Sequence, residues 1–389
     1  MALCLANSLL ARKDFCPYDQ LVRYKWWYQL GYMSSTGECF DIGNATRDSI
    51  ETFCRRQERL MKKENIAEAD IDYLDDPQLL KDFNVKCSQS GVAGNGALMR
   101  LAPVPLFFFR YPAIAVEYSG ISGEITHGDI KAYDACRYYA ALIVGVFQGI
   151  SKDQLLDRSF CSKHKDWFSG KPLCPEIQRI ADGSFKRERG YDDGIRGKGY
   201  IVNALEAALW AFWSDNNSFE KGALAAVNLG DDTDTTAAIY GQLAGALYGY
   251  RKLRGNWLKY VYAHEFMLNL SKWIAFEGEN WKSEKDRSLS SDATSYQAAT
   301  NAPYNSNQYQ GDTNPTGRAQ GTNKPRESQR RNDDTRSSDY TSGQTLGLQT
   351  LQRISSANYA GHNSGYGKKN NFKITMILII FFFKIILHL

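Results

Sequence analysis

The sequence predicts an all-α domain over residues 1–281 of the 389. Three segments, 137–149, 202–213 and 237–253, are nearly apolar around the whole circumference of a helix and place small residues between large ones. Helices with this pattern are central in a large bundle, where Ala and Gly allow close approach. No alternating strand pattern interrupts them, which excludes a central sheet.

Composition limits the function classes. A formal net charge of +4 excludes a polycation built to neutralise many phosphates, so we expect no nucleic-acid partner. The eight cysteines are scattered without a C-x-x-C pair, which indicates neither a zinc ribbon nor a disulfide scaffold. We therefore expect the protein to lie in a reducing compartment, the cytoplasm. We also expect it to be a monomer.

The chain begins with an apolar run of signal-peptide length, residues 1–12, in which the basic residue follows the apolar residues. A signal peptide has its basic residues first, so a buried amphipathic helix fits better. Nothing in the sequence caps the start of this helix.

Beyond the helical region the composition changes twice. Residues 282–371 are rich in Ser, Asn, Gln, Thr, Gly and Arg, which predicts a disordered, polar low-complexity tail. Residues 372–389 are apolar but contain Lys384, which would cost about 2.5 to 3.5 kcal/mol inside a bilayer. Two interpretations stay open: a marginal tail anchor, which would be the one contact with a membrane, or a translated A/T-rich non-coding stretch, which we favour.

The polar junction at residues 228–236 carries the strongest chemical signal. Asp231, Asp232 and Asp234 place three carboxylates within four residues, directly before the predicted helix 237–253. Such groups repel one another unless a cation or strong donors lie between them, and oxygen ligands suit Mg²⁺, Mn²⁺ or Ca²⁺. The alternative is a helix start with surplus acidic caps. We favour the metal because one cap carboxylate would suffice.

Three other junctions are weak signals when each is taken alone. The glycine-rich segment 91–103, with Gly94, Asn95 and Gly96, fits a loop before a helix, or a loop whose N–H groups hold a phosphate. Residues 126–129 fit a helix cap with an exposed or ligand-facing His127. Residues 37–46, which include Asp41, fit a turn before a helix.

Taken together and in order, these junctions resemble the ADP-ribosylglycohydrolase family, whose members remove ADP-ribose from modified proteins such as dinitrogenase reductase. The resemblance covers residues 1–281, and its most specific part is the last of the segments that carry it. These segments are Phe40-Asp41-Ile42-Gly43, Gly94-Asn95-Gly96 with Met99-Arg100 and Ala102-Pro103, Thr126-His127, Gly197-Lys198-Gly199-Tyr200, and Gly230-Asp231-Asp232-Thr233-Asp234-Thr235.

The resemblance implies an orthogonal multi-helix bundle with a central cleft that holds two divalent ions, Mg²⁺ or Mn²⁺. It also implies site residues in four roles. They are Asp232, Asp234 and Thr235 as metal ligands, Asp231 behind them, Gly94, Asn95, Gly96 and His127 at the substrate, and Asp41 as a structural residue at the edge of the cleft.

The implied activity is metal-dependent hydrolysis of the N- or O-glycosidic bond that joins ADP-ribose to a protein. The partner is then an ADP-ribosylated protein or an ADP-ribose-like small molecule. The family's Thr-Asp-Asp segment, half of its metal site, is expected before Met1, so the sequence suggests an N-terminally truncated chain and identifies no catalytic residue. A non-catalytic ADP-ribose-binding protein or an inactive fragment therefore remains the alternative.

Overall fold

The computed structural model describes residues 1–284 and 286. Over this part of the chain the regular structure is helical, no strand is present, and one isolated antiparallel bridge joins Gly94 to Tyr200. The all-α prediction is confirmed. The longer helices are α1 (Ala2–Arg12), α2 (Pro17–Leu30), α3 (Asn44–Glu64), α7 (Pro112–Glu124), α8 (Ile130–Phe147), α12 (Ile201–Ser214), α13 (Phe219–Asn228), α14 (Thr233–Tyr248) and α16 (His264–Asn280).

Shorter helical pieces connect the long helices. Several of them begin with proline, whose fixed φ suits the first turn of a helix. They are α4 (Pro77–Asp82), α5 (Gly96–Met99), α6 (Pro103–Phe107), α9 (Lys152–Leu155), α10 (Phe160–Lys163), α11 (Pro175–Ala181), α15 (Gly255–Leu258) and the 3₁₀ turns η1 (Ile71–Tyr73), η2 (Lys165–Phe168), η3 (Gly190–Asp193) and η4 (Tyr250–Lys252).

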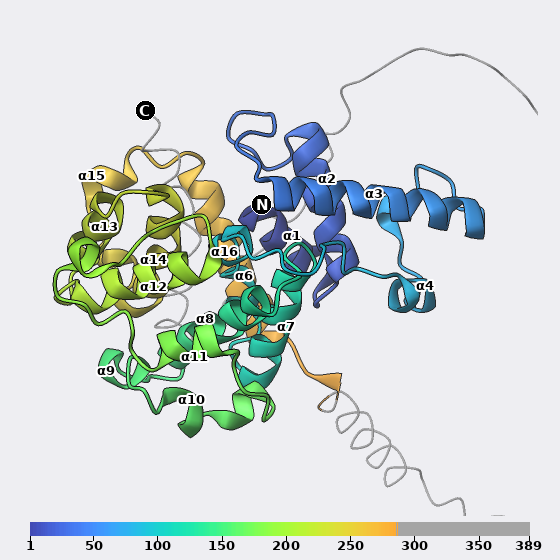
Figure 1. The fold of residues 1–389 in the computed structure, drawn as a ribbon. Coiled ribbons are helices and arrows are strands. Elements are labelled where there is room, and N and C mark those ends of the chain that lie inside the picture. Colours follow the sequence, from blue (N-terminus) through green and yellow to red (C-terminus); the bar gives the residue numbers. More distant parts are fainter. Residues whose placement is uncertain (285, 287–389) are drawn as a thin grey trace, which may run out of the picture. The chain divides into compact units, whose positions relative to one another are not determined.

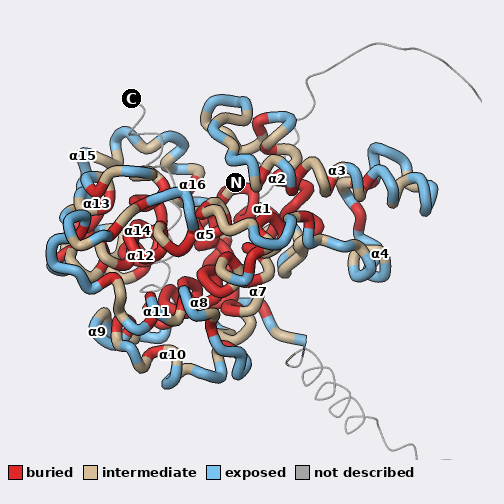
Figure 2. The backbone as a smooth tube through the Cα atoms, in the orientation of Figure 1, coloured by how far each residue is buried: buried red, intermediate tan, exposed pale blue. Residues whose placement is uncertain are grey.

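The three apolar segments of the sequence form the centre of residues 1–281. They correspond to α8, α12 and α14, which pack against one another and are largely buried (Figures 1 and 2). Small residues allow this approach: a Cβ atom on Gly222 of α13 would lie 2.2 Å from the Tyr240 hydroxyl oxygen of α14. Helix α14 ends earlier than predicted, at Tyr248, because Gly249 turns to a φ of 78° and the η4 turn follows.

Helix α1 is buried as the sequence predicts. It packs against α2, α6 and α16, and its side chains Leu3, Cys4, Leu5 and Leu9 lie in the core. No side chain caps its first turn. Its N-terminal residues Met1 to Leu3 line a cavity described below, so the start of α1 lies beside the candidate site.

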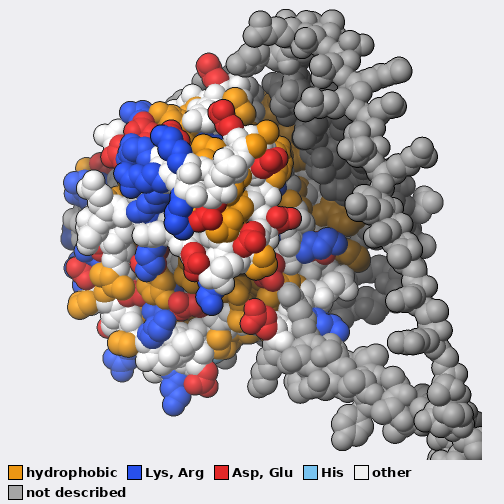
Figure 3. Space-filling view, turned by 90° about the vertical axis from the view of Figure 1, so that its right-hand side faces the viewer, with side chains coloured by type: hydrophobic (Ala, Val, Ile, Leu, Met, Phe, Trp, Pro, Cys, Tyr) orange, Lys and Arg blue, Asp and Glu red, His pale blue; other side chains and the backbone are white. Residues whose placement is uncertain are grey.

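Helix α3 extends away from the core toward α4 (Figure 1). Its last turns expose Arg55, Arg59, Lys62 and Lys63. Figure 3 views this side of the molecule and shows Lys and Arg side chains gathered on one part of it, with Asp and Glu side chains nearby. Glu58 and Glu64 are also exposed on the last turns of α3, so the surface of this projecting helix is of mixed charge.

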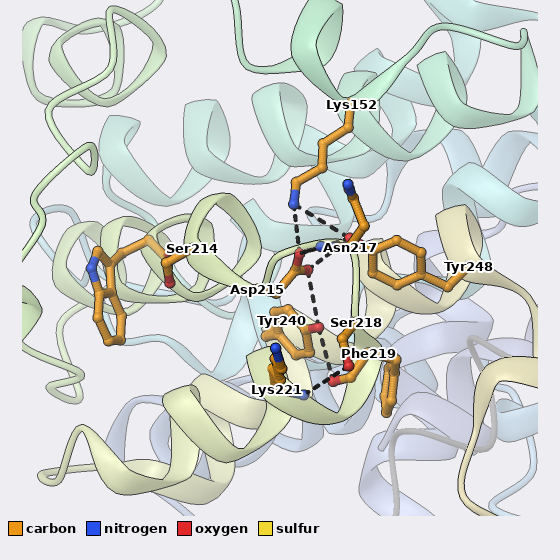
Figure 4. Close-up of polar contacts among 10 residues, drawn as sticks. Lys152, Ser214, Asp215, Asn217, Ser218, Phe219, Lys221, Tyr240 and Tyr248 are labelled. Carbon is orange, nitrogen blue, oxygen red and sulfur yellow. Dashed lines mark hydrogen bonds and ion pairs between the residues drawn. The ribbon is translucent and has the colours of Figure 1, made fainter.

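A closed polar network holds the C-terminal half of α14 (Figure 4). The fully buried carboxylate of Asp215, just after α12, accepts hydrogen bonds from Lys152 Nζ at 2.6 Å and from the Tyr248 hydroxyl at 2.8 Å. The Tyr240 hydroxyl lies 3.2 Å from the second carboxylate oxygen, and the backbone N–H of Asn217 donates at 2.8 Å. This network joins α9, α12, α13 and α14 and fixes how they pack.

Among the described residues, no helix combines the length and the apolar character that a membrane crossing requires. The predicted polar tail, apart from residues 282–284 and 286, and the apolar segment 372–389 lie outside the described residues.

Candidate functional site

The predicted polar junctions meet at one cavity of about 570 Å³. Its wall is formed by the start of α1, the α2–α3 loop, the glycine-rich segment before α5, His127 before α8, and the start of α14. Of the residues predicted for the site, it is lined by Asp41, Gly94, Asn95, Gly96, His127, Asp232 and Thr235, with Trp27, Met33, Thr46, Arg100 and Gly199 among the other lining residues.

Asp232 is anchored at the base of this cavity. It is the N-cap residue of α14, but its side chain makes no capping hydrogen bond and is available to other groups. Its backbone N–H donates to the Gly197 carbonyl at 2.6 Å. The Asn95 side-chain amide donates to the Asp232 carboxylate at 2.7 Å. Residues more than a hundred positions apart in the chain are thereby held together.

The charged form of the Asp232 side chain is disfavoured by its surroundings. Partial burial raises its pKa above the ordinary value, the neighbouring Asp234 raises it further by a hydrogen bond and by its charge, and the amide of Asn95 opposes the rise. Two interacting carboxylates at one helix start are the arrangement that a cation would relieve.

The remaining members of the acidic run have different surroundings. Asp234 Oδ1 accepts from the Thr235 backbone N–H at 2.8 Å, and the Thr235 hydroxyl lies 3.8 Å from the Met99 sulfur. Thr235 lines the cavity, whereas its lining does not include Asp231 or Asp234. Within the described part of the chain, no group of three or more His, Cys, Asp and Glu side chains is arranged to hold a metal ion.

The glycine-rich segment is held by a short backbone pairing. The Asn95 N–H donates to the Gly199 carbonyl and the Ile201 N–H to the Ala93 carbonyl, both at 2.9 Å. The backbone N–H of Asn95 is therefore occupied by protein, and its side chain by Asp232, rather than both being directed at a ligand. Neither Gly94 nor Gly96 has a positive φ.

His127 leaves little space for a side chain at Gly94 and ordinary contact distance at Gly96. A Cβ atom on Gly94 would lie 3.2 Å from His127 Nε2, and one on Gly96 would lie 3.4 Å from the same atom. The imidazole is 2% exposed. Burial, with the positive charge of Arg100 as a smaller cause, lowers the pKa of His127 to about 3, so its ring is neutral at physiological pH.

The junction at residues 126–129 contains the predicted helix cap, but His127 is buried rather than exposed. The Asp129 side chain accepts from the Lys131 backbone N–H at 2.8 Å and caps α8, while His127 lines the cavity. Asp41 lies on the cavity wall, within the α2–α3 loop, and has a left-handed backbone with a φ of 49°.

Other lining residues were not identified from the sequence as site residues. Gly199 and Thr46 belong to segments that the sequence singles out, residues 197–200 and 37–46, but without a role of their own. Trp27 and Met33 carry no signal in the sequence. Their positions follow from the packing of α1, α2 and α3, which sequence pattern alone does not give.

Comparison with known proteins identifies related chains. The family model described as ADP-ribosylglycohydrolase matches residues 1–284. An ADP-ribosylarginine hydrolase Tri1 of Pseudomonas putida (strain GB-1) is 35% identical over 264 residues, and one of Serratia proteamaculans (strain 568) is 31% identical over 279 residues. These matches cover 67% and 71% of this chain, and 60% and 65% of the relatives' own lengths.

More distant and structural matches agree. The ADP-ribosyl-[dinitrogen reductase] glycohydrolase of Rhodospirillum rubrum is 27% identical over 173 residues, which is 43% of this chain and 50% of that protein. A solved structure entitled "ADP-ribosylglycohydrolase-related protein complex" superposes with a TM-score of 0.53 at 33% identity, and covers 71% of this chain and 79% of the matched one.

Proposed function

The chain belongs to the ADP-ribosylglycohydrolase family, and we propose that its cavity binds ADP-ribose carried by a modified protein and hydrolyses the glycosidic bond that holds it. One observation carries the proposal. Residues 40–46, 94–96 and 127, together with Asp232 and Thr235, come from distant parts of the chain and line a single cavity. Loops that served only as connectors would have no reason to converge in this way.

A divalent cation, Mg²⁺ or Mn²⁺, fits the kind of donors at the start of α14, where Asp232 and Thr235 line the cavity and Asp234 lies between them in the sequence. Asp232, Asp234 and Thr235 offer only oxygen ligands, which such ions prefer. When bound, the ion would supply charge to polarise the sugar oxygens and to activate a water. Two ions are expected from the resemblance, and these three residues would hold one part of that site.

The chain's own residues have separate tasks in this proposal. Asn95 holds the Asp232 carboxylate through its amide, so the acid keeps one orientation at the cavity wall. His127, neutral and next to Gly94 and Gly96, faces the bound ADP-ribose. The substrate to test first is arginine-linked ADP-ribose, because two relatives carry that activity in their names.

Release of ADP-ribose from an arginine-ADP-ribosylated protein tests the proposal. We expect release with Mg²⁺ and none with a chelator, and we expect Asp232→Asn and Asp234→Asn to reduce release to the background rate. Asp153→Asn, which alters an exposed carboxylate on α9, is the matched control and should keep the full rate. Equal rates for all four proteins would refute the assignment.

Binding without hydrolysis is the second candidate function. It is favoured by the lack, among the described residues, of three acidic or nitrogen and sulfur ligands that could together hold a metal. This candidate predicts that ADP-ribose binds with the same affinity in Mg²⁺ and in chelator, and that no ADP-ribose is released from the modified protein.

A further inference from the structure

Arg100 is a buried cation behind the cavity wall. It is 1% exposed, and its four hydrogen bonds go to neutral acceptors. These are the Tyr24 hydroxyl at 3.1 Å, the Gly96 carbonyl at 3.0 Å, the Ser122 carbonyl at 2.8 Å and the Thr126 hydroxyl at 2.7 Å. A buried charge is costly, so its retention beside a cavity calls for a physical reason.

Two hydrogen-bond partners of the Thr126 hydroxyl determine the direction in which its proton points. The guanidinium group of Arg100 carries N–H donors and no acceptor atom, so it must donate to Thr126 Oγ1. The second neighbour is His127 Nδ1, at 2.9 Å. A hydroxyl carries one proton and two acceptor lone pairs, and among the hydrogen bonds of the described residues the only other partner of this oxygen is that ring nitrogen. An Nδ1–H that donated to Oγ1 would leave the proton of this buried hydroxyl without an acceptor, so the satisfied arrangement is the one in which the Thr126 O–H donates to an unprotonated Nδ1.

This arrangement determines the other nitrogen of the ring. The imidazole is neutral, so it carries one proton, and with Nδ1 acting as acceptor that proton lies on Nε2. Nε2 has no hydrogen-bond partner in the described part of the chain. It lies beside Gly94 and Gly96, whose missing side chains leave it uncovered where His127 lines the cavity.

We propose that Arg100 and Thr126 are positioning residues that act through His127: the chain of hydrogen bonds from Arg100 through Thr126 fixes the Nε2–H tautomer and makes the imidazole a donor into the cavity. A fixed donor selects an oxygen of the ligand at this point and rejects a second donor there. This inference deepens the proposed function and rests on it only for the identity of the ligand.

The first experiment reads the tautomer directly and needs no ligand. In a ¹⁵N–¹H NMR spectrum of histidine-labelled protein, the wild type should show His127 with an unprotonated Nδ1 and a protonated Nε2. Thr126→Val keeps the shape but removes the hydroxyl, so we expect the Nε2–H signature to be lost or mixed. Thr126→Ser restores a hydroxyl and should restore the signature.

A matched control separates this role from general packing. Ser49→Ala removes a buried hydroxyl whose single proton is shared between the Ala45 carbonyl at 2.8 Å and the Thr126 carbonyl at 3.1 Å, so it disturbs the same residue without touching the Thr126 hydroxyl. Its His127 spectrum should equal that of the wild type. Calorimetric titration with ADP-ribose should then show an affinity about tenfold lower for Thr126→Val, as expected for one misdirected hydrogen bond, and no change for Thr126→Ser or Ser49→Ala.

The outcomes are distinguishable. A wild-type His127 protonated on Nδ1, or an unchanged spectrum in Thr126→Val, overturns the inference even if that variant is poorly stable, since the wild-type spectrum stands alone. Equal ADP-ribose affinity in Thr126→Val and wild type overturns the donor role. A wild type that binds no ADP-ribose overturns the proposed function instead, and the inference is then judged by the spectra.

Discussion

Two acidic side chains near opposite ends of α14, Asp215 and Asp232, have opposite surroundings. Asp215 packs against the C-terminal half of this helix, and its side chain has no exposure. Lys152, two tyrosine hydroxyls and a backbone N–H make hydrogen bonds to its carboxylate. Asp232, at the N-terminal end, faces a cavity, and its nearest charged neighbour is another carboxylate. The Asp215 network, which we call the closed cluster, is complete without a ligand. Asp232 and the residues that line the cavity with it, His127 among them, are not, and we call them the open cluster.

The difference teaches where function lies. Buried polar groups whose hydrogen bonds are all made within the protein contribute to stability and specify packing. Polar groups that are held in place but left facing a cavity keep their capacity for an external partner. The Asp215 network thus belongs to the fold, and we propose a binding role for the Asp232 cluster, although both contain a buried or partly buried acid.

The largest expected effect separates the clusters by stability. Asp215→Ala removes one partner of a buried ion pair and leaves Lys152 uncompensated, which should lower the free energy of unfolding by about 3 to 5 kcal/mol. Asp232→Asn keeps an acceptor for Asn95 and removes a repulsion with Asp234, so it should change that free energy by less than about 1 kcal/mol. Urea unfolding measures both. Similar losses in the two variants would break the comparison.

The next effect concerns pH and the neutral ring of the open cluster. The pKa of His127 is lowered to about 3 in the folded protein, so the unfolded chain binds that proton more readily. The part of the free energy of unfolding that comes from this neutral ring is fully present above about pH 6.5. It is lost as pH falls, by roughly 2 kcal/mol between pH 6.5 and pH 5. His127→Gln should remove this part of the slope. An identical pH dependence in the variant would show that the ring is not held neutral.

The smallest effect tests how complete the closed cluster is. Tyr248→Phe removes one hydroxyl that donates to Asp215, while Lys152 and the Asn217 N–H remain. We expect a loss of about 1 kcal/mol in the free energy of unfolding, and unchanged ADP-ribose affinity. A lowered ADP-ribose affinity in Tyr248→Phe would mean that the two clusters are coupled rather than separate.

Local pattern was sufficient for much of the fold. The apolar circumference of α8, α12 and α14 and the acidic run before α14 are properties of neighbouring residues, so the sequence shows them. The end of α14 at Tyr248 was missed because Gly249 can continue or end a helix, and only the packing around it decides which.

The site was only partly visible in the sequence. Its glycines suggested phosphate-binding N–H groups, but the Asn95 N–H is used by Gly199, and His127 leaves little space for a side chain at Gly94. Arg100 stood in a recognised motif without a role, since its partner Thr126 lies 26 positions away. Roles that depend on pairs so far apart follow from the arrangement of helices, not from spacing in the chain.

The central claim is that the open cluster is an ADP-ribose site, and unfolding in the presence of ADP-ribose tests it most directly. At a ligand concentration about 100 times the dissociation constant, the wild type with Mg²⁺ should gain about 2.7 kcal/mol in the free energy of unfolding. Asn95→Ala, which releases the Asp232 carboxylate, should gain less at the same concentration. No gain for the wild type, with or without Mg²⁺, would contradict the claim.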